Sequence, residues 1–348
     1  MSPYVITILL SSLGLGTALT FMSSHWLLAW MGLEINTLAI LPLMAQQHHP
    51  RAVEATIKYF LAQAAAAATI LFASTINAWT TGEWNISCLT DPTAITLVMM
   101  ALALKVGLAP VHFWMPPVMQ GLTLSTGLIM ATWQKLAPFA LILQLAPSVH
   151  PQLLTALGLM SVLAGGWGGL SQTQLRKILA YSSIAHLGWM IIVLQFKPQL
   201  TMLTLAIYII MTATAFLTLK SVSATKITTL ATSWPKSPII ATTTAMALLS
   251  LGGLPPLTGF MPKWLILQEL TTQNLPLTAT IMALSALLSL YFYLRLCYAM
   301  TLTAAPTTNN HLTPWRVQNT QNTLPLATLS TMTLLLLPLT PLVQALMT

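Results

Sequence analysis

The residues best suited to chemistry are ionisable side chains that stand inside long apolar segments. They are one glutamate, three lysines and one histidine, namely Glu34, Lys105, Lys135, His186 and Lys263. Charged groups at membrane depth are costly, and where they occur they commonly mark a path for ions or protons. All five side chains can take up and release a proton. The set therefore predicts proton translocation as the chemistry of this chain.

Two of the lysines lie beside breaks in apolar segments. Lys105 precedes Gly107 and Pro110, and Lys263 follows a stretch rich in glycine and proline over residues 252–262. Lipid cannot hydrogen-bond a broken backbone, so such breaks persist only inside a protein or against water. Interrupted helices in corresponding places of two halves are typical of transport proteins.

The charges of the first half suggest separate roles. Glu34 is the one acid near the centre of a predicted span, and we expect it to be the counter-ion of Lys105. Its charge would either change partners as protons move or form a static, structural ion pair. Lys105 would close a half-helix, whose negative C-terminal end favours the protonated amine. Lys135 has no other acid at its depth and would exchange protons, because desolvation disfavours its charge. Snorkelling of Lys135 to an interface is the alternative.

Lys263 stands in the opposite local environment in this interpretation. It follows Pro262, which we expect at the first position of the second half-helix. The positive end of that half-helix disfavours a charged amine. The hypothesis is therefore that Lys105 holds a proton and Lys263 releases one.

His186 lies midway along its segment. It is either a relay between Lys135 and Lys263 or a histidine that is satisfied within the core. Hydroxyl groups that could hold water come just before it, on Tyr181, Ser182 and Ser183. His112 and Trp114 follow the first break and would either line an access path or anchor the membrane interface.

The composition identifies an integral membrane protein of the all-α class. Of the 348 residues, 56% are hydrophobic and 5% are charged, whereas soluble domains are about a quarter charged. A spanning helix needs about 20 mainly apolar residues. Eleven segments meet this requirement, at about 3–22, 25–45, 56–79, 93–117, 122–145, 152–170, 175–196, 200–219, 238–268, 275–300 and 324–346. The sequence therefore predicts a single polytopic transmembrane domain of eleven helices, of which 93–117 and 238–268 are broken.

The basic residues at or beyond the ends of these spans are unevenly distributed. One side of the membrane receives Arg51, Lys58, Arg176, Lys177, Lys220, Lys226, Lys236, Arg295 and Arg316. The other side receives only Lys197. Positive charge is retained on the inner side, so we expect the N-terminus in the matrix or cytoplasm and the C-terminus outside. No cleavable signal or arginine-rich transit segment precedes the first span, so a mitochondrial location would imply synthesis inside the organelle.

The order of the spans suggests an internal repeat. Two sets of five spans cover about 3–145 and 152–300, and a final span covers about 324–346. The broken segment is the fourth of each set. Because five is odd, adjacent copies would be inverted in the membrane, as in many transporters.

Other chemistries find no support in the pattern. Cys88 and Cys297 fit no iron–sulfur or zinc spacing, and we expect neither a metal nor a resident cofactor. The net charge of +8 comes without a basic run, so nucleic acid is not a predicted partner. The glycine-rich residues 165–169 lie at a helix end and are expected to pack helices rather than to bind a nucleotide.

Several motifs resemble the antiporter-like membrane subunits of respiratory complex I, which are similar in turn to subunits of multisubunit sodium/proton antiporters. The motifs are residues 104–116, Lys135, 176–186 and 251–263, together with 30–36 and 48–55, which resemble the vertebrate version. The resemblance extends over nearly the whole chain. The general family fold has three further helices, which would be N-terminal and absent here, as in the animal version.

The resemblance implies a place in the membrane arm of complex I, in the mitochondrial inner membrane. The family's glutamate and lysines correspond to Glu34, Lys105, Lys135 and Lys263, and its relay histidine corresponds to His186. NADH, flavin, iron–sulfur clusters and ubiquinone are then expected on partner subunits. The expected partners of this chain are the other membrane-arm subunits and the lipid bilayer, with cardiolipin as a candidate lipid.

Two alternative functions remain open at this point. A free-standing cation/proton antiporter would use the same charges, although no acidic cluster for sodium is evident. A structural scaffold would use the polar residues only to hold helices together. Moving one charge against the membrane potential costs about 2.3 kcal/mol per 100 mV, so a pumping subunit without redox chemistry must receive its energy through a partner.

Overall fold

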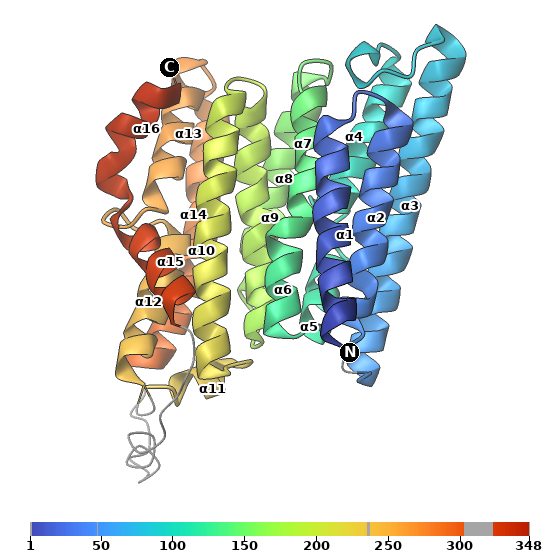
Figure 1. Cartoon of the computed structure of the whole chain (residues 1–348). Helices are drawn as coiled ribbons and strands as arrows, with labels where there is room; N and C mark the ends of the chain where they lie inside the picture. The colour runs from blue at the N-terminus through green and yellow to red at the C-terminus, as the bar shows by residue number, and fades with distance from the viewer. Residues whose placement is uncertain (1, 47, 235–236, 303–322, 348) are drawn as a thin grey trace. The chain divides into compact units, whose positions relative to one another are not determined.

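The computed structural model describes residues 2–46, 48–234, 237–302 and 323–347. The chain divides into two compact units, residues 1–161 and 162–348, and Figure 1 shows their helices. Within the described residues the regular elements are helices, apart from two isolated β-bridges. Lys236, Arg316 and residues 303–322, which enter the predicted charge distribution and loops, lie outside the described residues.

The first unit is built from helices that pack around α2 and α4. Its α-helices are α1 (Pro3–Met22), α2 (Trp26–Met44), α3 (Pro50–Thr81), α4 (Pro92–Val106), α5 (Met115–Gly121), α6 (Leu124–Ala131), α7 (Leu136–Leu145) and the first part of α8 (Pro151–Gly169). Short 3₁₀ turns occur at η1 (Ile86–Cys88) and η2 (Trp133–Lys135). Helix α1 packs on α2 and α7, and α4 packs on α3 and α7.

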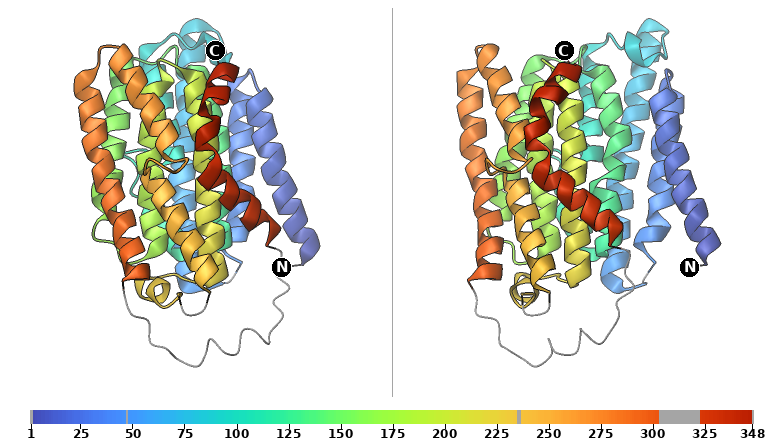
Figure 2. Two further views of the ribbon diagram at one scale, coloured as in Figure 1. Left: turned by 90° about the vertical axis from the view of Figure 1, so that its left-hand side faces the viewer. Right: turned by 60° about the vertical axis from the view of Figure 1, so that its left-hand side comes forward.

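The second unit contains the rest of α8 and the elements that follow it. They are α9 (Leu175–Leu194), α10 (Pro198–Val222), α11 (Ile227–Ala231), α12 (Pro238–Gly252), α13 (Phe260–Thr272), α14 (Pro276–Thr301), α15 (Leu324–Leu335), η5 (Leu337–Leu339) and α16 (Thr340–Met347). Helix α12 packs on α10 and α14, and α13 packs on α9, α10 and α14. Figure 2 shows the bend between α15 and α16.

Helices α4 and α12 have the same local design. Each has 15 residues and begins with a proline, which lacks the N–H that the first helical position leaves unpaired. Each ends at a glycine in the left-handed conformation, with φ 88° at Gly107 and 79° at Gly253. Each unit also has an isolated β-bridge. His25, just before α2, bridges to Asn85 after α3, and Gln174, just before α9, bridges to Lys226 after α10.

All eleven predicted segments are helical over most of their length. Among the described residues, seven helices are long and apolar enough to cross a membrane, with Leu124–Leu145 (α6, η2 and α7) counted as one. The protein is therefore an all-helical, multi-pass membrane protein, and the breaks predicted within 93–117 and 238–268 are present between α4 and α5 and between α12 and α13, the latter visible in Figure 1.

The structure differs from the predicted spans in three details. Helix α3 begins at Pro50 rather than near residue 56, so Glu54, which was expected in a loop, lies in the helix and forms an ion pair with Lys58 one turn later. The predicted span 122–145 is present as Leu124–Leu145, but it contains the 3₁₀ turn η2, where Pro138 has no N–H for the carbonyl of Gln134. The span 324–346 is interrupted at η5, which contains Pro338.

Candidate functional site

The first break is a tight reversal that begins at the end of α4. The N–H groups of Gly107 and Leu108 both donate to the Ala103 carbonyl, at 2.9 and 2.8 Å. A Cβ atom on residue 107 would lie 3.1 Å from the sulfur of Met115. The positive φ and the close approach both favour glycine at this position.

Side chains from other elements complete the hydrogen bonding of this break. Trp114 Nε1 donates to Leu104 O at 2.9 Å, Gln63 Nε2 donates to Lys105 O at 3.4 Å, and Ala109 N–H donates to Ser161 Oγ at 3.0 Å. These bonds satisfy a backbone that lipid could not. The sequence interpretation missed Gln63 and Ser161, although each is a polar side chain inside an apolar segment. It left Trp114 undecided, and the structure makes Trp114 a cap of α4.

Lys105 lies at the end of α4 with its ammonium group enclosed. The residue is 5% exposed, and its Nζ atom is buried without a hydrogen-bond partner among the described residues. Glu34 does not form an ion pair with Lys105 within 4.0 Å, although the two charges attract each other through space. The Glu34 carboxylate instead accepts a hydrogen bond from Thr37 Oγ1 at 3.1 Å.

A small cavity joins Lys105 to Lys135. The volume that is open to the centre of a water molecule is about 20 Å³, and the lining includes Asn36, Gln63 and Tyr59. Asn36 is 2% exposed, and neither polar atom of its side chain has a hydrogen-bond partner among the described residues. A polar cavity of this size has space for about one water molecule.

Lys135 reaches this cavity from η2. It is 3% exposed and follows Gln134, whose side-chain amide donates to Asn36 O at 3.4 Å. The interruption of the helix at Lys135 was not predicted. Each of the three intramembrane lysines is consequently found at or beside a break in its helix.

The second break positions Lys263 against the end of α12. Lys263 Nζ donates a hydrogen bond of 2.8 Å to the carbonyl oxygen of Gly252. Helix α13 begins at Phe260, so Pro262 is its third residue and not its first as predicted. The ammonium group therefore faces the negative, C-terminal end of α12. The predicted electrostatic contrast was wrong in this respect, because Lys105 lies at the C-terminal end of α4 and the Nζ atom of Lys263, although its residue is in the first turn of α13, lies at the C-terminal end of α12.

Residue 253 must remain small for this contact to form. A Cβ atom there would lie 2.9 Å from both Cδ and Nζ of Lys263. Gly259 is equally constrained, since its Cβ would lie 1.7 Å from the carbonyl oxygen of Ser250. Thr258 Oγ1 also donates to the carbonyl of Thr333 in α15. The second break is thus fixed by close backbone approach and by hydrogen bonds.

His186 lies beside Lys263 in the second unit. The two side chains line a narrow space with Ser182, Ser289 and Tyr293 that leaves no room for the centre of a water molecule. The imidazole ring of His186 is centred 5.6 Å from the ring of Tyr208.

The hydroxyl groups expected to hold water beside His186 have local partners. The Ser182 hydroxyl donates to the backbone carbonyl of Leu179 at 2.8 Å, and the Ser183 hydroxyl donates to that of Ala180 at 2.7 Å. His112, from the first break, is 8% exposed and stacks on Phe113 with ring centroids 4.6 Å apart.

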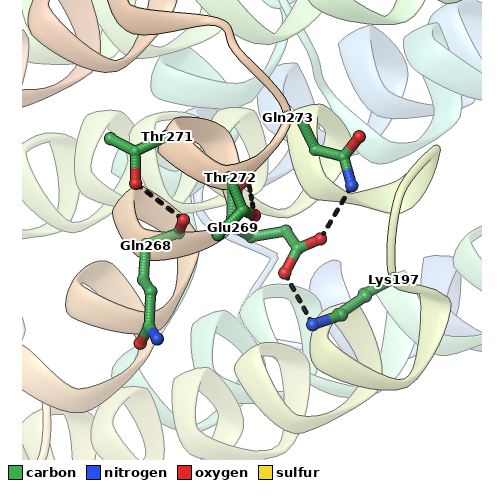
Figure 3. Close-up of polar contacts among 6 residues, drawn as sticks. All are labelled: Lys197, Gln268, Glu269, Thr271, Thr272 and Gln273. Atoms are coloured by element: carbon green, nitrogen blue, oxygen red, sulfur yellow. Dashed lines mark hydrogen bonds and ion pairs between the residues drawn. The ribbon is translucent and has the colours of Figure 1, made fainter.

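A second charged pair lies just beyond the predicted span 238–268. Lys197 Nζ and Glu269 Oε2 are 2.6 Å apart, and Gln273 Nε2 donates to Glu269 Oε1 at 3.1 Å; Figure 3 shows both side chains directed at the carboxylate. Burial raises the pKa of Glu269, but the hydrogen bonds from Lys197 and Gln273 and the positive charge of Lys197 together outweigh it, so that the pKa lies below its ordinary value. The sequence interpretation did not pair these residues.

Metal ligation was not expected from the sequence. Among the residues that the structure describes, there is no group of three or more histidine, cysteine, aspartate or glutamate side chains that could hold a metal ion.

Comparisons with known proteins connect this geometry to a family. Residues 23–289 match the model "NADH:quinone oxidoreductase/Mrp antiporter, TM", and residues 290–344 match "NADH dehydrogenase subunit 2 C-terminus". NADH-ubiquinone oxidoreductase chain 2 of Formosania lacustris is 74% identical over 324 residues, which cover 93% of each chain. The same subunit of Scyliorhinus canicula is 62% identical over 348 residues, which cover 100% of each chain.

A solved structure shows the same fold. A chain in the structure of respiratory complex I from Thermus thermophilus with bound aureothin is similar with a TM-score of 0.85 and 29% identity. The match covers 98% of this chain and 80% of that chain. This chain therefore belongs to the family of NADH-ubiquinone oxidoreductase chain 2, the antiporter-like membrane subunits of respiratory complex I.

Proposed function

We propose that this chain translocates protons in the membrane arm of complex I, coupled to electron transfer from NADH to ubiquinone. The observation that supports this most directly is the cavity that Lys105 and Lys135 share. Lys105 and Asn36 line it with polar atoms that have no hydrogen-bond partner among the described residues, and it has room for about one water molecule. Two amines on one hydrated cavity can exchange a proton through the water between them.

In the first unit, the proton would arrive from the matrix side and pass from Lys105 to Lys135. Glu34 acts on Lys105 through space rather than by contact, so its charge can change the proton affinity of the amine without locking it in an ion pair. Thr37 orients the Glu34 carboxylate. Asn36 would orient the water, since its amide has both a donor and an acceptor available.

In the second unit, His186 would receive the proton and Lys263 would release it. Their side chains line one narrow space. Lys263 can keep its hydrogen bond to Gly252 in either protonation state, because both an ammonium group and a neutral amine donate. The end of α12 therefore holds the nitrogen in place while a proton arrives and leaves.

The fold we propose has eleven spans and two inverted five-helix repeats, about 3–145 and 152–300, with a final span at 324–346. The common design of α4 and α12 supports the repeat, as do the matching bridges after α3 and α10. In the mitochondrial inner membrane the N-terminus would lie in the matrix and the C-terminus in the intermembrane space.

The partners we propose are the other membrane-arm subunits and the surrounding lipid, which could include cardiolipin. Flavin, iron–sulfur clusters and the sites for NADH and ubiquinone would belong to partner subunits. Energy would then reach this chain through its contacts with those subunits, since each charge moved against 100 mV costs about 2.3 kcal/mol.

The test is proton pumping measured together with NADH–quinone electron transfer in assembled complexes that have Lys135→Ala or Lys263→Ala. We expect both activities to fall while assembly persists. Lys220→Ala is the matched control, because Lys220 is an exposed lysine in the last turn of α10. If both activities persist in the first two variants, the buried charges are structural and the scaffold interpretation is favoured.

A free-standing cation/proton antiporter is the second candidate. The family model that matches residues 23–289 includes Mrp antiporters. Reconstitution of the purified chain in vesicles separates the two functions. Cation-dependent proton exchange by the chain alone would favour the antiporter, whereas exchange only in the assembled complex would favour the coupled pump.

A further inference from the structure

A large cavity lies at one end of the second unit, away from the buried lysines. Its walls come from the turn between α9 and α10 and from the last turns of α13, and its volume is about 810 Å³. This volume falls within the range of about 300–1,000 Å³ that is typical of small-molecule sites. Since the cavity is formed where apolar helices end, we expect it near the depth where lipid head groups meet water.

The cavity wall contains one positive and one negative side chain. They are Lys197 and Glu269, which pair with each other. The Lys197 side chain is 61% exposed, whereas that of Glu269 is 9% exposed. An ammonium group has three donors, and Glu269 accepts only one of them, so two remain for a ligand.

The remainder of the wall is neutral. Gln199, Gln268 and Gln273 line the cavity with amide groups, and Phe196, Leu200 and Leu265 provide apolar surface. Gln273 donates to one carboxylate oxygen of Glu269, Oε1, while Lys197 contacts the other, Oε2, as Figure 3 shows. The carboxylate is therefore fixed in position, but each of its oxygens has a further lone pair.

A wall with both charges and no net charge favours a zwitterion. A phosphate group would accept from the free donors of Lys197, and a primary ammonium group would donate to Glu269 and to glutamine oxygens. A lipid with extra negative charge would place that charge near Glu269, which is unfavourable. A choline group has no N–H to donate, so it would lose those hydrogen bonds.

We propose that this cavity binds the phosphoethanolamine head group of a membrane phospholipid. The glycerol and upper acyl chains would lie on the apolar surface at Phe196, Leu200 and Leu265. The site is separate from the lysines of the proposed proton path, so it does not depend on the proposed function.

The experiment uses intact complex that contains this chain, exchanged with phosphatidylethanolamine bearing a photoreactive group near the head group. After illumination, cross-linked peptides are identified by mass spectrometry. We expect cross-links within residues 196–200 and 265–273. Phosphatidylcholine and cardiolipin with the same photoreactive group are the comparison probes, each used in place of phosphatidylethanolamine. They should label these peptides about tenfold less, which corresponds to a preference of about 1.4 kcal/mol.

Variants test the charge pair itself. Glu269→Gln and Lys197→Gln should each reduce labelling of these peptides by about tenfold, whereas Glu269→Asp should retain most of it. Lys220→Gln is the matched control, because it removes an exposed lysine from the opposite end of α10 and should leave labelling unchanged. Native gel electrophoresis confirms that every variant is assembled to the same extent.

Equal labelling by all three lipids would overturn the proposal, since the charge pair would then confer no selectivity. Cross-links elsewhere in the complex but none to residues 196–200 or 265–273 would also overturn it, because a neighbouring subunit would then cover the cavity. Undiminished labelling in Glu269→Gln and Lys197→Gln would equally contradict a role for the pair.

Discussion

The ammonium group of Lys263 donates a 2.8 Å hydrogen bond to the carbonyl oxygen of Gly252, the last residue of α12. The final carbonyl groups of a helix have no partners within it, so this lysine caps the helix that precedes its own. The same contact places the charge at the negative end of the α12 dipole. A break in one helix thus creates both the space for Lys263 and the acceptor that orients it.

Gly253→Ala should displace Lys263 and impair proton pumping. The new Cβ would lie 2.9 Å from Cδ and Nζ of the lysine, on a residue whose φ is 79°. A non-glycine residue in this conformation costs about 1–2 kcal/mol. Thermal unfolding and coupled pumping of the assembled complex measure the two effects. Gly14→Ala is the control, because nothing lies within 4 Å of a Cβ there; equal losses in both variants would contradict the prediction.

Ser161→Ala should destabilise the first break. The Ser161 hydroxyl accepts the N–H of Ala109 at 3.0 Å, and Ser161 is fully buried. Leaving that N–H without a partner costs about 1–3 kcal/mol. The midpoint of thermal unfolding should fall accordingly, whereas Ser11→Ala, on the exposed face of α1, should change it little. A Ser161→Ala complex as stable as the wild type would show that another group takes over the bond.

Asn36→Leu should reduce pumping without loss of stability. The asparagine and leucine side chains have similar shapes, and the change removes two buried polar atoms that have no partner among the described residues. The free energy of unfolding should therefore be unchanged or higher by about 1–3 kcal/mol. If Asn36 orients water beside Lys105, pumping and electron transfer should nevertheless fall. Leu38→Ala, at an exposed position on the same helix, is the control. Unimpaired pumping in Asn36→Leu would remove Asn36 from the proton path.

The contribution of Glu269 to stability should not vary with pH near neutrality. Burial raises its pKa, but hydrogen bonds from Lys197 and Gln273 and the charge of Lys197 together outweigh burial and hold the pKa below the ordinary value of 4.5. A carboxylate with a lowered pKa contributes its full stabilisation above the unfolded-state pKa and loses it as pH falls through the folded-state pKa. The difference in unfolding temperature between wild type and Glu269→Gln should thus be constant above about pH 5.5.

This difference should also be small. The Lys197 side chain is 61% exposed, and ion pairs with an exposed partner contribute at most about 1 kcal/mol. Differential scanning fluorimetry of the assembled complex between about pH 5.5 and 8 is the measurement. A difference that changes across this range would mean that the pKa of Glu269 is raised rather than lowered.

The sequence by itself determined the class of the protein and the positions of its unusual residues. Long apolar segments with few charges can only be membrane spans, and a lysine such as Lys105 or Lys263 beside glycine and proline marks a break, because local chemistry alone makes these features costly in lipid. Proline and glycine also specify helix ends locally, so α4 and α12 could be placed closely. The interruption at Lys135 was missed, since Pro138 in a helix can also be accommodated by a kink.

Only the tertiary structure decided which groups satisfy the breaks. Gln63 and Ser161 reach the first break from α3 and α8, and no local pattern specifies such distant partners. The pairing of Lys197 with Glu269 has the same origin. The electrostatic environment of Lys263 was predicted wrongly because its own helix suggested a positive environment, whereas the fold brings the negative end of α12 to it. Local sequence specifies where a charge stands, but the electrostatic field on that charge depends on elements that packing brings near.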